Sequence, residues 1–286
     1  MCGIVGFTGR ENALPILIKG LYSLEYRGYD SAGVAAFTKD GLRVVKARGR
    51  IANLEEKIKE EGGDMYCTCG IGHTRWATHG EPSDRNSHPH LGGKGKVAVV
   101  HNGIIENYKE LRERLEAHGY EFKSETDTET VAHLVDYLHT GKQEDLAKTV
   151  LQAVQRLRGS YALGVVSMDN TQEIVAARRG NPLVIGIGEG ENMIASDITA
   201  IINRTKRYII LDDNEVAIVR PDSVVVMNEF GDTVEKEIMT VTWDMSAAEK
   251  GGYQHFMLKE IMEQPKAVAD TVKPRIKNDA VVFEDN

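Results

Sequence analysis

Apolar residues recur at two different spacings along the chain, and these spacings predict strands and helices in a definite order. Residues 4–8 form a short apolar run typical of a buried strand, and helical spacing follows over residues 14–24, with Gly28 marking the end. Further strands, punctuated by glycines, are predicted over residues 32–37, 42–47, 66–73 and 97–100. The first hundred residues are therefore expected to be mostly sheet.

Helical spacing dominates the middle of the chain. An apolar stripe over residues 107–118 predicts one helix, a capping pattern over residues 126–129 begins a second, and a third is predicted over residues 145–157. Short strands are predicted again over residues 161–167, 173–177, 183–187, 192–195, 215–218 and 223–227. Because helices do not separate each consecutive pair of strands, this order favours an α+β architecture with antiparallel pairing over repeated βαβ units.

The chain changes character after residue 241. Residues 244–252 are polar and end in two glycines, and the apolar positions that follow predict one more helix, which ends at Pro265. The last residues contain too few patterned apolar positions to form a core of their own. We interpret residues 2–241 as one domain, residues 242–252 as a linker, and residues 253–286 as the truncated start of a further domain.

Composition narrows the class of function. The 286 residues are 41% hydrophobic and 27% charged, which is typical of a soluble globular protein. A formal net charge of −8 disfavours nucleic-acid binding, and no apolar run approaches the ~18 residues of a membrane span. The N-terminus also lacks a basic region followed by an apolar one. We expect a cytoplasmic protein that acts on small molecules, without nucleic-acid or membrane partners.

Three cysteines indicate chemistry rather than a disulfide framework. Their number is odd, no paired CxxC sets suggest a zinc ribbon, and Cys67 and Cys69 are expected in a core. Cys2 follows the initiator methionine, so removal of Met1 would give it a free α-amine that can serve as base for its own thiol. The alternative is that Cys2 is a small buried residue that opens a strand.

Polar clusters follow the predicted strands and provide candidate site residues. Asn102 and Gly103 come after the apolar run 97–100, where an amide and an unhindered backbone N–H could form an oxyanion hole for acyl transfer. The alternative is an Asn-Gly turn, although the residues that follow predict a helix rather than a partner strand.

Two charged residues could hold the two ends of an α-amino acid. The guanidinium of Arg75 could bind a carboxylate through two parallel hydrogen bonds. Asp127 could pair with an ammonium group, or it could serve only as a helix-start residue. Trp76 could close over a ligand. We expect no metal, because neither an HExxH motif nor a set of carboxylates accompanies the four histidines His79, His88, His90 and His101.

Taken together, the motifs resemble the glutaminase domain of the glutamine:fructose-6-phosphate aminotransferase family. These are class II glutamine amidotransferases with the N-terminal nucleophile hydrolase fold, a four-layer αββα sandwich. Nine ordered motifs carry the resemblance, from CGIVG at Cys2 to ASD at Ala195; those between them are EYRGYDSAG at Glu25, GHTRWATHGEPS at Gly72, NSHPH at Asn86, HNGIIENY at His101, SETDTE at Ser124, RGSYAL at Arg158 and NPLVIG at Asn181.

The resemblance implies a role for each matching residue. Cys2 would attack the side-chain amide of L-glutamine to form a thioester, and Asn102 with Gly103 would hold the oxyanion. Arg75 would bind the glutamine α-carboxylate and Asp127 the α-amine. The remaining substrate-binding residues would form a loop that closes on glutamine or lie near the nucleophile: Trp76, Ala77, Thr78, His79 and Arg27.

The family passes its ammonia to fructose-6-phosphate to make glucosamine-6-phosphate, an amino-sugar precursor. A full member carries a sugar-isomerase half, needs no cofactor, and is expected to be a homo-oligomer. KEIMEQP at Lys259 resembles the opening helix of that half, so the chain is expected to hydrolyse glutamine without making amino sugar. Two alternatives are the glutaminase half of a phosphoribosyl pyrophosphate amidotransferase and, if Met1 is retained, a noncatalytic glutamine-binding module.

Overall fold

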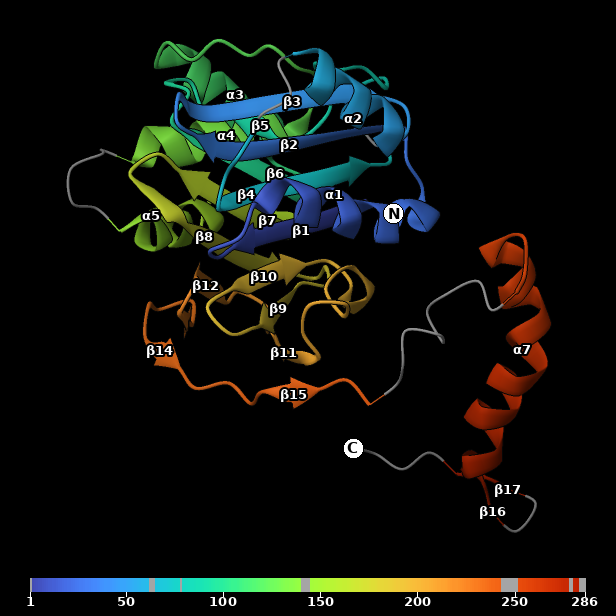
Figure 1. Cartoon of the computed structure of the whole chain (residues 1–286). Helices are drawn as coiled ribbons and strands as arrows, with labels where there is room; N and C mark the ends of the chain where they lie inside the picture. The colour runs from blue at the N-terminus through green and yellow to red at the C-terminus, as the bar shows by residue number, and fades with distance from the viewer. Residues whose placement is uncertain are drawn as a thin grey trace. The chain divides into compact units, whose positions relative to one another are not determined.

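The computed structural model describes residues 2–61, 65–77, 79–139, 145–242, 252–277 and 280–282. The chain divides into two units, residues 1–241 and 242–286. The first contains both large sheets (Figure 1). No helix in the described ranges is long and apolar enough to cross a membrane.

Two antiparallel sheets lie at the centre of the first unit. One has eight strands, in the spatial order β15 (Met239–Thr240), β11 (Arg207–Ile210), β9 (Val184–Ile187), β10 (Asn192–Ala195), β1 (Gly3–Thr8), β4 (Cys69–Arg75), β2 (Ser31–Thr38) and β3 (Gly41–Arg48). The other has seven, in the order β14 (Thr233–Val234), β13 (Ser223–Met227), β12 (Val216–Arg220), β8 (Asn170–Arg179), β7 (Gly159–Ser167), β6 (Val97–Ile105) and β5 (His90–Leu91).

Helices cover the outer face of each sheet. The eight-stranded sheet packs against α1 (Ala13–Leu24) and α2 (Ile51–Glu60). The seven-stranded sheet packs against α3 (Tyr108–Ala117), α4 (Asp127–Leu138) and α5 (Leu146–Val154). Two short 3₁₀ turns, η1 (Glu25–Arg27) and η2 (Ile198–Ala200), complete the unit. The layers follow the order helix, sheet, sheet, helix, which confirms the predicted αββα sandwich.

Three apolar clusters hold these layers together. The cluster between the sheets contains inward-facing residues of both, including Ile4 and Ile71 from one and Val100 and Ile174 from the other. The other two clusters lie between each sheet and its helices. Every residue of β1 is buried, because one face packs on α1 and the other on the second sheet. Cys67 and Cys69 are buried, as predicted.

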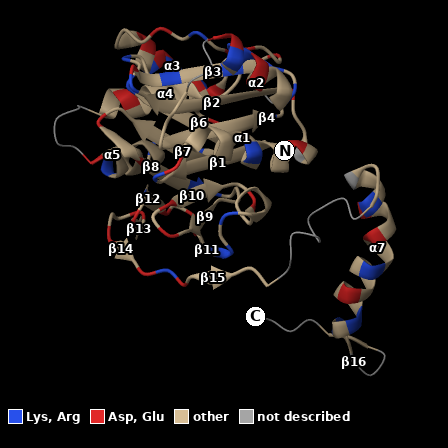
Figure 2. Ribbon diagram, viewed as in Figure 1, with Lys and Arg blue, Asp and Glu red and all other residues tan. Residues whose placement is uncertain are grey.

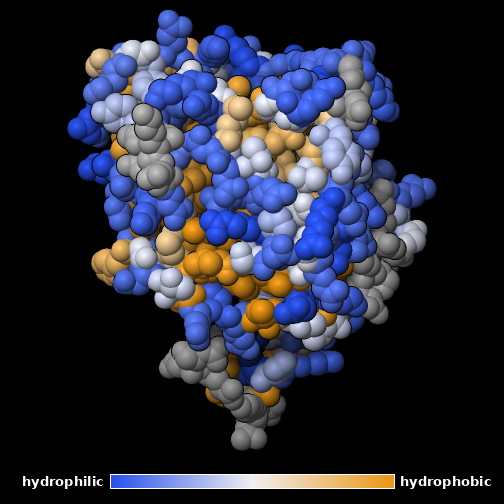
Figure 3. Space-filling view, turned by 60° about the vertical axis from the view of Figure 1, so that its left-hand side comes forward, coloured by the Kyte–Doolittle hydropathy of each residue, from blue (hydrophilic) through white to orange (hydrophobic). Residues whose placement is uncertain are grey.

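Charged residues lie mainly on the helices and connecting segments, and the strands between the layers carry few of them (Figure 2). The space-filling view shows a mostly polar face in which apolar residues gather in patches (Figure 3). This separation follows from the large desolvation penalty of an unpaired charge in an interior.

Two predicted element boundaries were wrong in ways that matter for the site. The strand expected to end at residue 100 continues as β6 to Ile105, so Asn102 and Gly103 lie within a strand that pairs with β7, not after its end. The strand expected from residue 66 begins at Cys69 and continues to Arg75. Pairing with neighbouring strands extends both elements beyond their apolar runs, which a one-dimensional pattern does not reveal.

Several elements were not predicted, and one helix is longer than expected. No element was predicted for α2, β11 or the two-residue strands β5, β14 and β15. In the second unit, α7 (Phe256–Val272) continues through Pro265, where it was expected to end. Good helix formers on both sides of Pro265 support the helix across the lost backbone hydrogen bond. A 3₁₀ turn, η3 (Lys273–Arg275), and a two-stranded ribbon follow, β16 (Ile276–Lys277) and β17 (Ala280–Val281).

Buried histidines fill one end of the space between the sheets. The ring centroids of His73 on β4 and His88 are 4.3 Å apart, and those of His88 and His90 are 5.0 Å apart. The ring of His101 on β6 is stacked 6.5 Å from His88. Burial lowers the pKa of His73 to about 3, and burial together with neighbouring positive groups lowers the pKa of His88 and His90 well below the usual value. These rings are therefore neutral in the folded protein.

Acidification should unfold the protein through this cluster. Below about pH 6.5 the histidines of the unfolded chain bind protons, whereas the buried rings of the folded protein stay neutral. The free energy of unfolding is therefore highest above that pH and falls progressively below it. We expect the Tm from calorimetry to drop by about 5 °C or more between pH 7 and pH 5. His88→Gln should flatten this dependence, and exchange of the exposed His118 for Gln should not. A Tm independent of pH in this range would contradict neutral burial.

Candidate active site

Cys2 lies immediately before β1, at the end of the sheet where β4 also ends. The register of the two strands pairs Gly3 with Thr74, which brings Cys2 beside Arg75 and Trp76. The Trp76 backbone N–H donates to Cys2 Sγ over 3.2 Å. Burial raises the pKa of the Cys2 thiol, an effect that this hydrogen bond and the charge of Arg75 oppose. A thiol with a raised pKa needs a base to become a nucleophile at neutral pH.

Asn102 reaches Cys2 from the other sheet. Its Nδ2 donates to the backbone carbonyl of Cys2 over 3.1 Å, which joins β6 to the start of β1. His73 Nε2 lies 3.0 Å from both Asn102 Oδ1 and the His101 carbonyl oxygen. Because both of these atoms are acceptors, the neutral His73 ring must carry its proton on Nε2. This donor fixes the orientation of the Asn102 amide and keeps its N–H groups directed toward Cys2.

Gly103 follows Asn102 with a backbone φ of +134°, a region that favours glycine. A Cβ at this position would lie 2.1 Å from the Ser160 carbonyl oxygen on the paired strand. No larger residue fits here without moving β6 away from β7. The close approach of the two backbones therefore requires the glycine that the sequence singled out.

Arg75 is buried and binds the loop that follows it. Its guanidinium donates to three backbone carbonyls, those of His79, Gly80 (2.9 Å) and Glu81 (3.4 Å). The structure therefore gives Arg75 a positioning role for this loop, which sequence reasoning had not assigned. A planar guanidinium has five N–H donors, so part of the group remains available for a ligand carboxylate.

The other predicted loop residues surround the same position. The Trp76 side chain is 55% exposed, and its ring packs against Gly28, where a Cβ would lie 2.2 Å from a ring carbon. The ring of His79 meets Tyr108 edge-on at 5.3 Å. Two predicted residues cannot be assessed, because Thr78 and the side chain of Arg27 lie outside the described residues.

Asp30 is a site residue that sequence reasoning missed. Its carboxylate accepts the Ala77 N–H and, over 2.8 Å, the Ser31 hydroxyl, while its own N–H donates to the Arg75 carbonyl over 2.8 Å. Asp30 therefore anchors the loop at Ala77 from the position immediately before β2 begins. The available signal was an acidic residue directly before a strand within a polar cluster, but only the pairing of β2 with β4 reveals its target.

Asp127 is the first residue of α4 and is only 4% exposed. Its Oδ2 accepts the backbone N–H of Ile105 over 2.8 Å, which ties the helix to the end of β6. Thr126 caps the helix by accepting the Glu129 N–H, as the capping pattern predicted. Thr128 lies 2.9 Å from His101 Nδ1 and holds the next ring of the histidine cluster.

A cavity of about 20 Å³ remains between these groups. Its lining includes Cys2, Gly103 and Asp127, which confirms that one place collects residues distant in sequence. The volume accommodates about one water molecule, so glutamine could enter only if the segment around Trp76 and His79 moved. Within the described ranges, no group of three or more His, Cys, Asp or Glu side chains could hold a metal ion.

Comparisons with known proteins show which family the chain is similar to. A family model described as "Glutamine amidotransferase domain" matches residues 73–203. The glutamine–fructose-6-phosphate aminotransferase (isomerizing) of Clostridium tetani is 54% identical over 96% of this chain and 45% of its own length. The protein of the same name from Thermotoga maritima is 50% identical over the whole chain and 46% of its own length. The chain spans about half the length of these relatives.

Solved structures show the same fold. The glutamine phosphoribosylpyrophosphate amidotransferase of B. subtilis is 27% identical, with a TM-score of 0.66 over 81% of this chain and 50% of that one. A structure titled as the allosteric regulatory enzyme of purine biosynthesis is 28% identical, with a TM-score of 0.68 over 80% of this chain and 49% of that one. The chain therefore belongs to the glutamine amidotransferases that have the N-terminal nucleophile hydrolase fold.

Proposed function

We propose that the chain hydrolyses the side-chain amide of L-glutamine to glutamate and ammonia through a thioester on Cys2. The observation that supports this most directly is the contact between the sheets at Cys2, where the Trp76 N–H meets Sγ and Asn102 holds the backbone. Family membership supports the same reaction class. The proposal requires removal of Met1, because only then is the α-amine of Cys2 free.

The reaction proceeds in two acyl-transfer steps. The free α-amine takes the thiol proton, and Sγ attacks the carboxamide carbon to form a tetrahedral oxyanion. In this proposal Asn102 Nδ2 and the Gly103 N–H donate to this oxygen. Collapse of the intermediate breaks the C–N bond, and the protonated amine delivers the proton that lets ammonia leave. Water then attacks the thioester, with the same amine as base, and releases glutamate.

Substrate binding rests on charge complementarity. Glutamine carries one negative and one positive group at its α-carbon, and Arg75 and Asp127, which both line the cavity, offer opposite charges. The segment that Arg75 and Asp30 anchor, with Trp76, Ala77, Thr78 and His79, closes over the bound substrate. Arg27 completes the set near the nucleophile.

We further propose that residues 2–241 are the ammonia-supplying domain of a cytoplasmic, homo-oligomeric enzyme that converts fructose-6-phosphate to glucosamine-6-phosphate. In this view residues 242–252 are a linker and residues 253–286 begin the sugar-isomerase domain. The supporting observation is the 54% identity to relatives named for that reaction, of which this chain spans about 45%. Identity to the phosphoribosylpyrophosphate amidotransferase of B. subtilis is only 27%, which makes that alternative weaker.

Labelling should identify Cys2 as the nucleophile. A diazoketone analogue of glutamine should add one equivalent to Cys2 in chain that lacks Met1, as read by intact mass and peptide mapping. Cys2→Ser should reduce kcat by about 10³-fold or more, whereas Cys67→Ala should leave it nearly unchanged. Burial raises the pKa of Cys67 to about 11 and of Cys69 to about 12, so neither forms a thiolate readily. Glutamine binding without turnover in processed protein would favour the noncatalytic alternative.

The amide of Asn102 should stabilise the oxyanion of the transition state. His73 should affect the rate only by orienting that amide. Asn102→Ala should lower kcat by about 10²-fold or more with little change in KM. His73→Leu should lower kcat by about tenfold, and His73→Gln, which keeps an N–H donor, should recover part of the loss. In an Asn102→Ala background, His73→Leu should have little further effect on kcat. Additive losses would show that His73 does not act through Asn102.

Asp127 should recognise the substrate ammonium. Asp127→Asn should raise KM for glutamine by about tenfold, because a charge-assisted hydrogen bond contributes about 1.5–3 kcal/mol. The analogue that lacks the α-amine should be used equally by wild type and variant. Asp136→Asn, a buried change on the same helix, should not alter the preference between the two substrates. Equal penalties for both substrates in Asp127→Asn would assign the residue a structural role only.

A further inference from the structure

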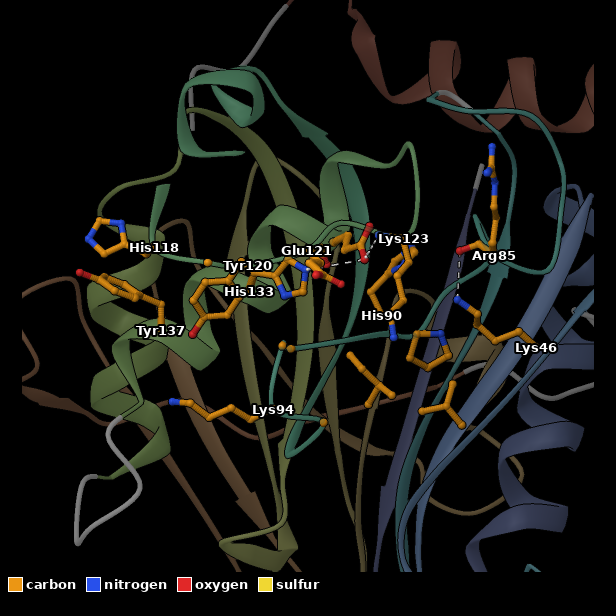
Figure 4. Close-up of a pocket in the computed structure, with 18 residues that line it drawn as sticks. Lys46, Arg85, His90, Lys94, His118, Tyr120, Glu121, Lys123, His133 and Tyr137 are labelled. Atoms are coloured by element: carbon orange, nitrogen blue, oxygen red, sulfur yellow. Dashed lines mark hydrogen bonds and ion pairs between the residues drawn. The ribbon is translucent and has the colours of Figure 1, made fainter. Parts of the chain in front are cut away.

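A second, much larger cavity of about 960 Å³ lies in the same unit as the candidate active site (Figure 4). Its lining comes from β3, β5 and the glycine-rich turn after it, residues 118–123, and the last turns of α4. None of its lining residues lines the small cavity at Cys2. The glutaminase mechanism therefore makes no use of it. Its volume is in the range of cavities that hold cofactors and drug-sized ligands.

The cavity is positively charged on an otherwise acidic protein. Its lining carries Lys46, Arg85, Lys94 and Lys123 against two glutamates, Glu121 and Glu129, whereas the chain has a formal net charge of −8. The Glu129 carboxylate is occupied by the backbone N–H groups of Lys123 and Ser124. Arg85 forms an exposed ion pair with Glu125 at 2.7 Å. Concave surfaces with one sign of charge concentrate ligands of the opposite sign.

Lys46 is the cationic group of this cavity whose burial most favours binding of an anion. It lies half-buried on β3, and its Nζ donates to the Arg85 carbonyl over 3.1 Å. Among the described residues it forms no ion pair within 4.0 Å, and the more distant charges of Glu129 and Asp84 offset only part of its desolvation. Burial lowers the pKa of Lys46 to about 8. A bound anion would supply the missing partner and restore the ordinary basicity of the amine.

His133 offers an unpartnered acceptor in the middle of the lining. Its Nε2 lies 3.2 Å from the Glu121 carbonyl oxygen, an acceptor, so the neutral ring carries its proton on Nε2. Nδ1 is then an acceptor, and it is buried without a hydrogen-bond partner. A ligand hydroxyl can donate to this nitrogen once the His133 ring turns toward the cavity, so binding is expected to reorient the ring.

Aromatic rings form the end of the cavity away from Lys46. Figure 4 shows His118, Tyr120 and Tyr137 on one side, Lys46 and Arg85 on the other, and His133 between them. The Tyr137 side chain is 43% exposed, and the His118 ring packs edge-on against it at 4.9 Å. An exposed, laterally supported ring is a platform on which a planar group can stack.

We propose that this cavity binds a mononucleotide, with the phosphate at Lys46, a sugar hydroxyl at His133 and the base stacked on Tyr137. The order of cation, hydroxyl acceptor and aromatic ring across the cavity matches the order of phosphate, sugar and base in such a ligand. In this proposal Lys94 and Lys123 add to the positive potential of the cavity and do not contact the phosphate directly.

Calorimetric titration with three probes tests the assignment: uridine monophosphate, inorganic phosphate and uridine, at equal ionic strength. Uridine monophosphate should bind most tightly, phosphate more weakly, and uridine weakest of all. The affinity for uridine monophosphate should fall as the pH rises from 7 to about 8.5, because Lys46 loses its proton while the phosphate monoester, with a second pKa near ~6, is already dianionic. Affinity that is unchanged across this range would overturn the role of Lys46.

Variants separate the two ends of the ligand. Lys46→Met should weaken both uridine monophosphate and phosphate by about tenfold or more, whereas the exposed Tyr137→Ala should weaken uridine monophosphate and spare phosphate. Lys96→Met, an exposed lysine outside the cavity, serves as the matched control and should change neither. Melting temperatures of all variants establish that they are folded.

The outcome is independent of the proposed glutaminase chemistry. Cys2→Ala protein should bind uridine monophosphate as tightly as wild type, because the two cavities share no lining residue. Binding of uridine monophosphate no tighter than uridine, or undiminished binding by Lys46→Met, would refute the site even if glutamine hydrolysis is confirmed. If wild-type protein that lacks Met1 does not hydrolyse glutamine but does bind uridine monophosphate, the proposed function is refuted and the mononucleotide site is supported.

Discussion

The hydrogen bonds that run from His73 through Asn102 to Cys2 are the constraint on which the site depends. They cross from one sheet to the other and back, so the distance between the sheets determines whether Cys2 and the proposed oxyanion donors meet. The apolar cluster between the sheets fixes that distance, because close-packed interiors resist small displacements. The packing of the core therefore also sets the geometry of the site. A substitution deep between the sheets would shift the position of Asn102 relative to Cys2.

This arrangement requires a set of buried, neutral histidines. A hydrogen-bond donor without charge is what Asn102 requires, since a charged ring in the same place would be both costly to bury and electrostatically opposed by Arg75. Burial keeps His73 neutral, and the stacked rings of His88 and His101 surround it with further groups that resist protonation. The same burial that orients the amide makes the fold sensitive to acid.

The two cavities differ in size, charge and closure, although α4 contributes to both. Asp127 begins the helix at the small cavity, and His133 and Tyr137 lie in its later turns at the large one. The first is nearly filled by protein, and the loop held by Arg75 and Asp30 lies over it. The second is much larger and basic, and among the described residues His133 Nδ1 in its lining has no hydrogen-bond partner. One element thus carries the carboxylate that we propose binds substrate and part of a separate ligand-sized cavity.

The sequence alone determined the order of strands and helices, the αββα class, and most candidate residues, because apolar spacing and short motifs are local properties. It placed Cys2, Asn102, Gly103, Arg75 and Asp127 in one proposed site. Only the tertiary structure decided that Asn102 lies within a paired strand, that His73 orients its amide, and that Asp30 anchors the loop. It alone revealed the basic cavity around Lys46. Each of these features joins residues that are far apart in the chain, and strand pairing and layer packing, which depend on the whole fold, bring them into contact.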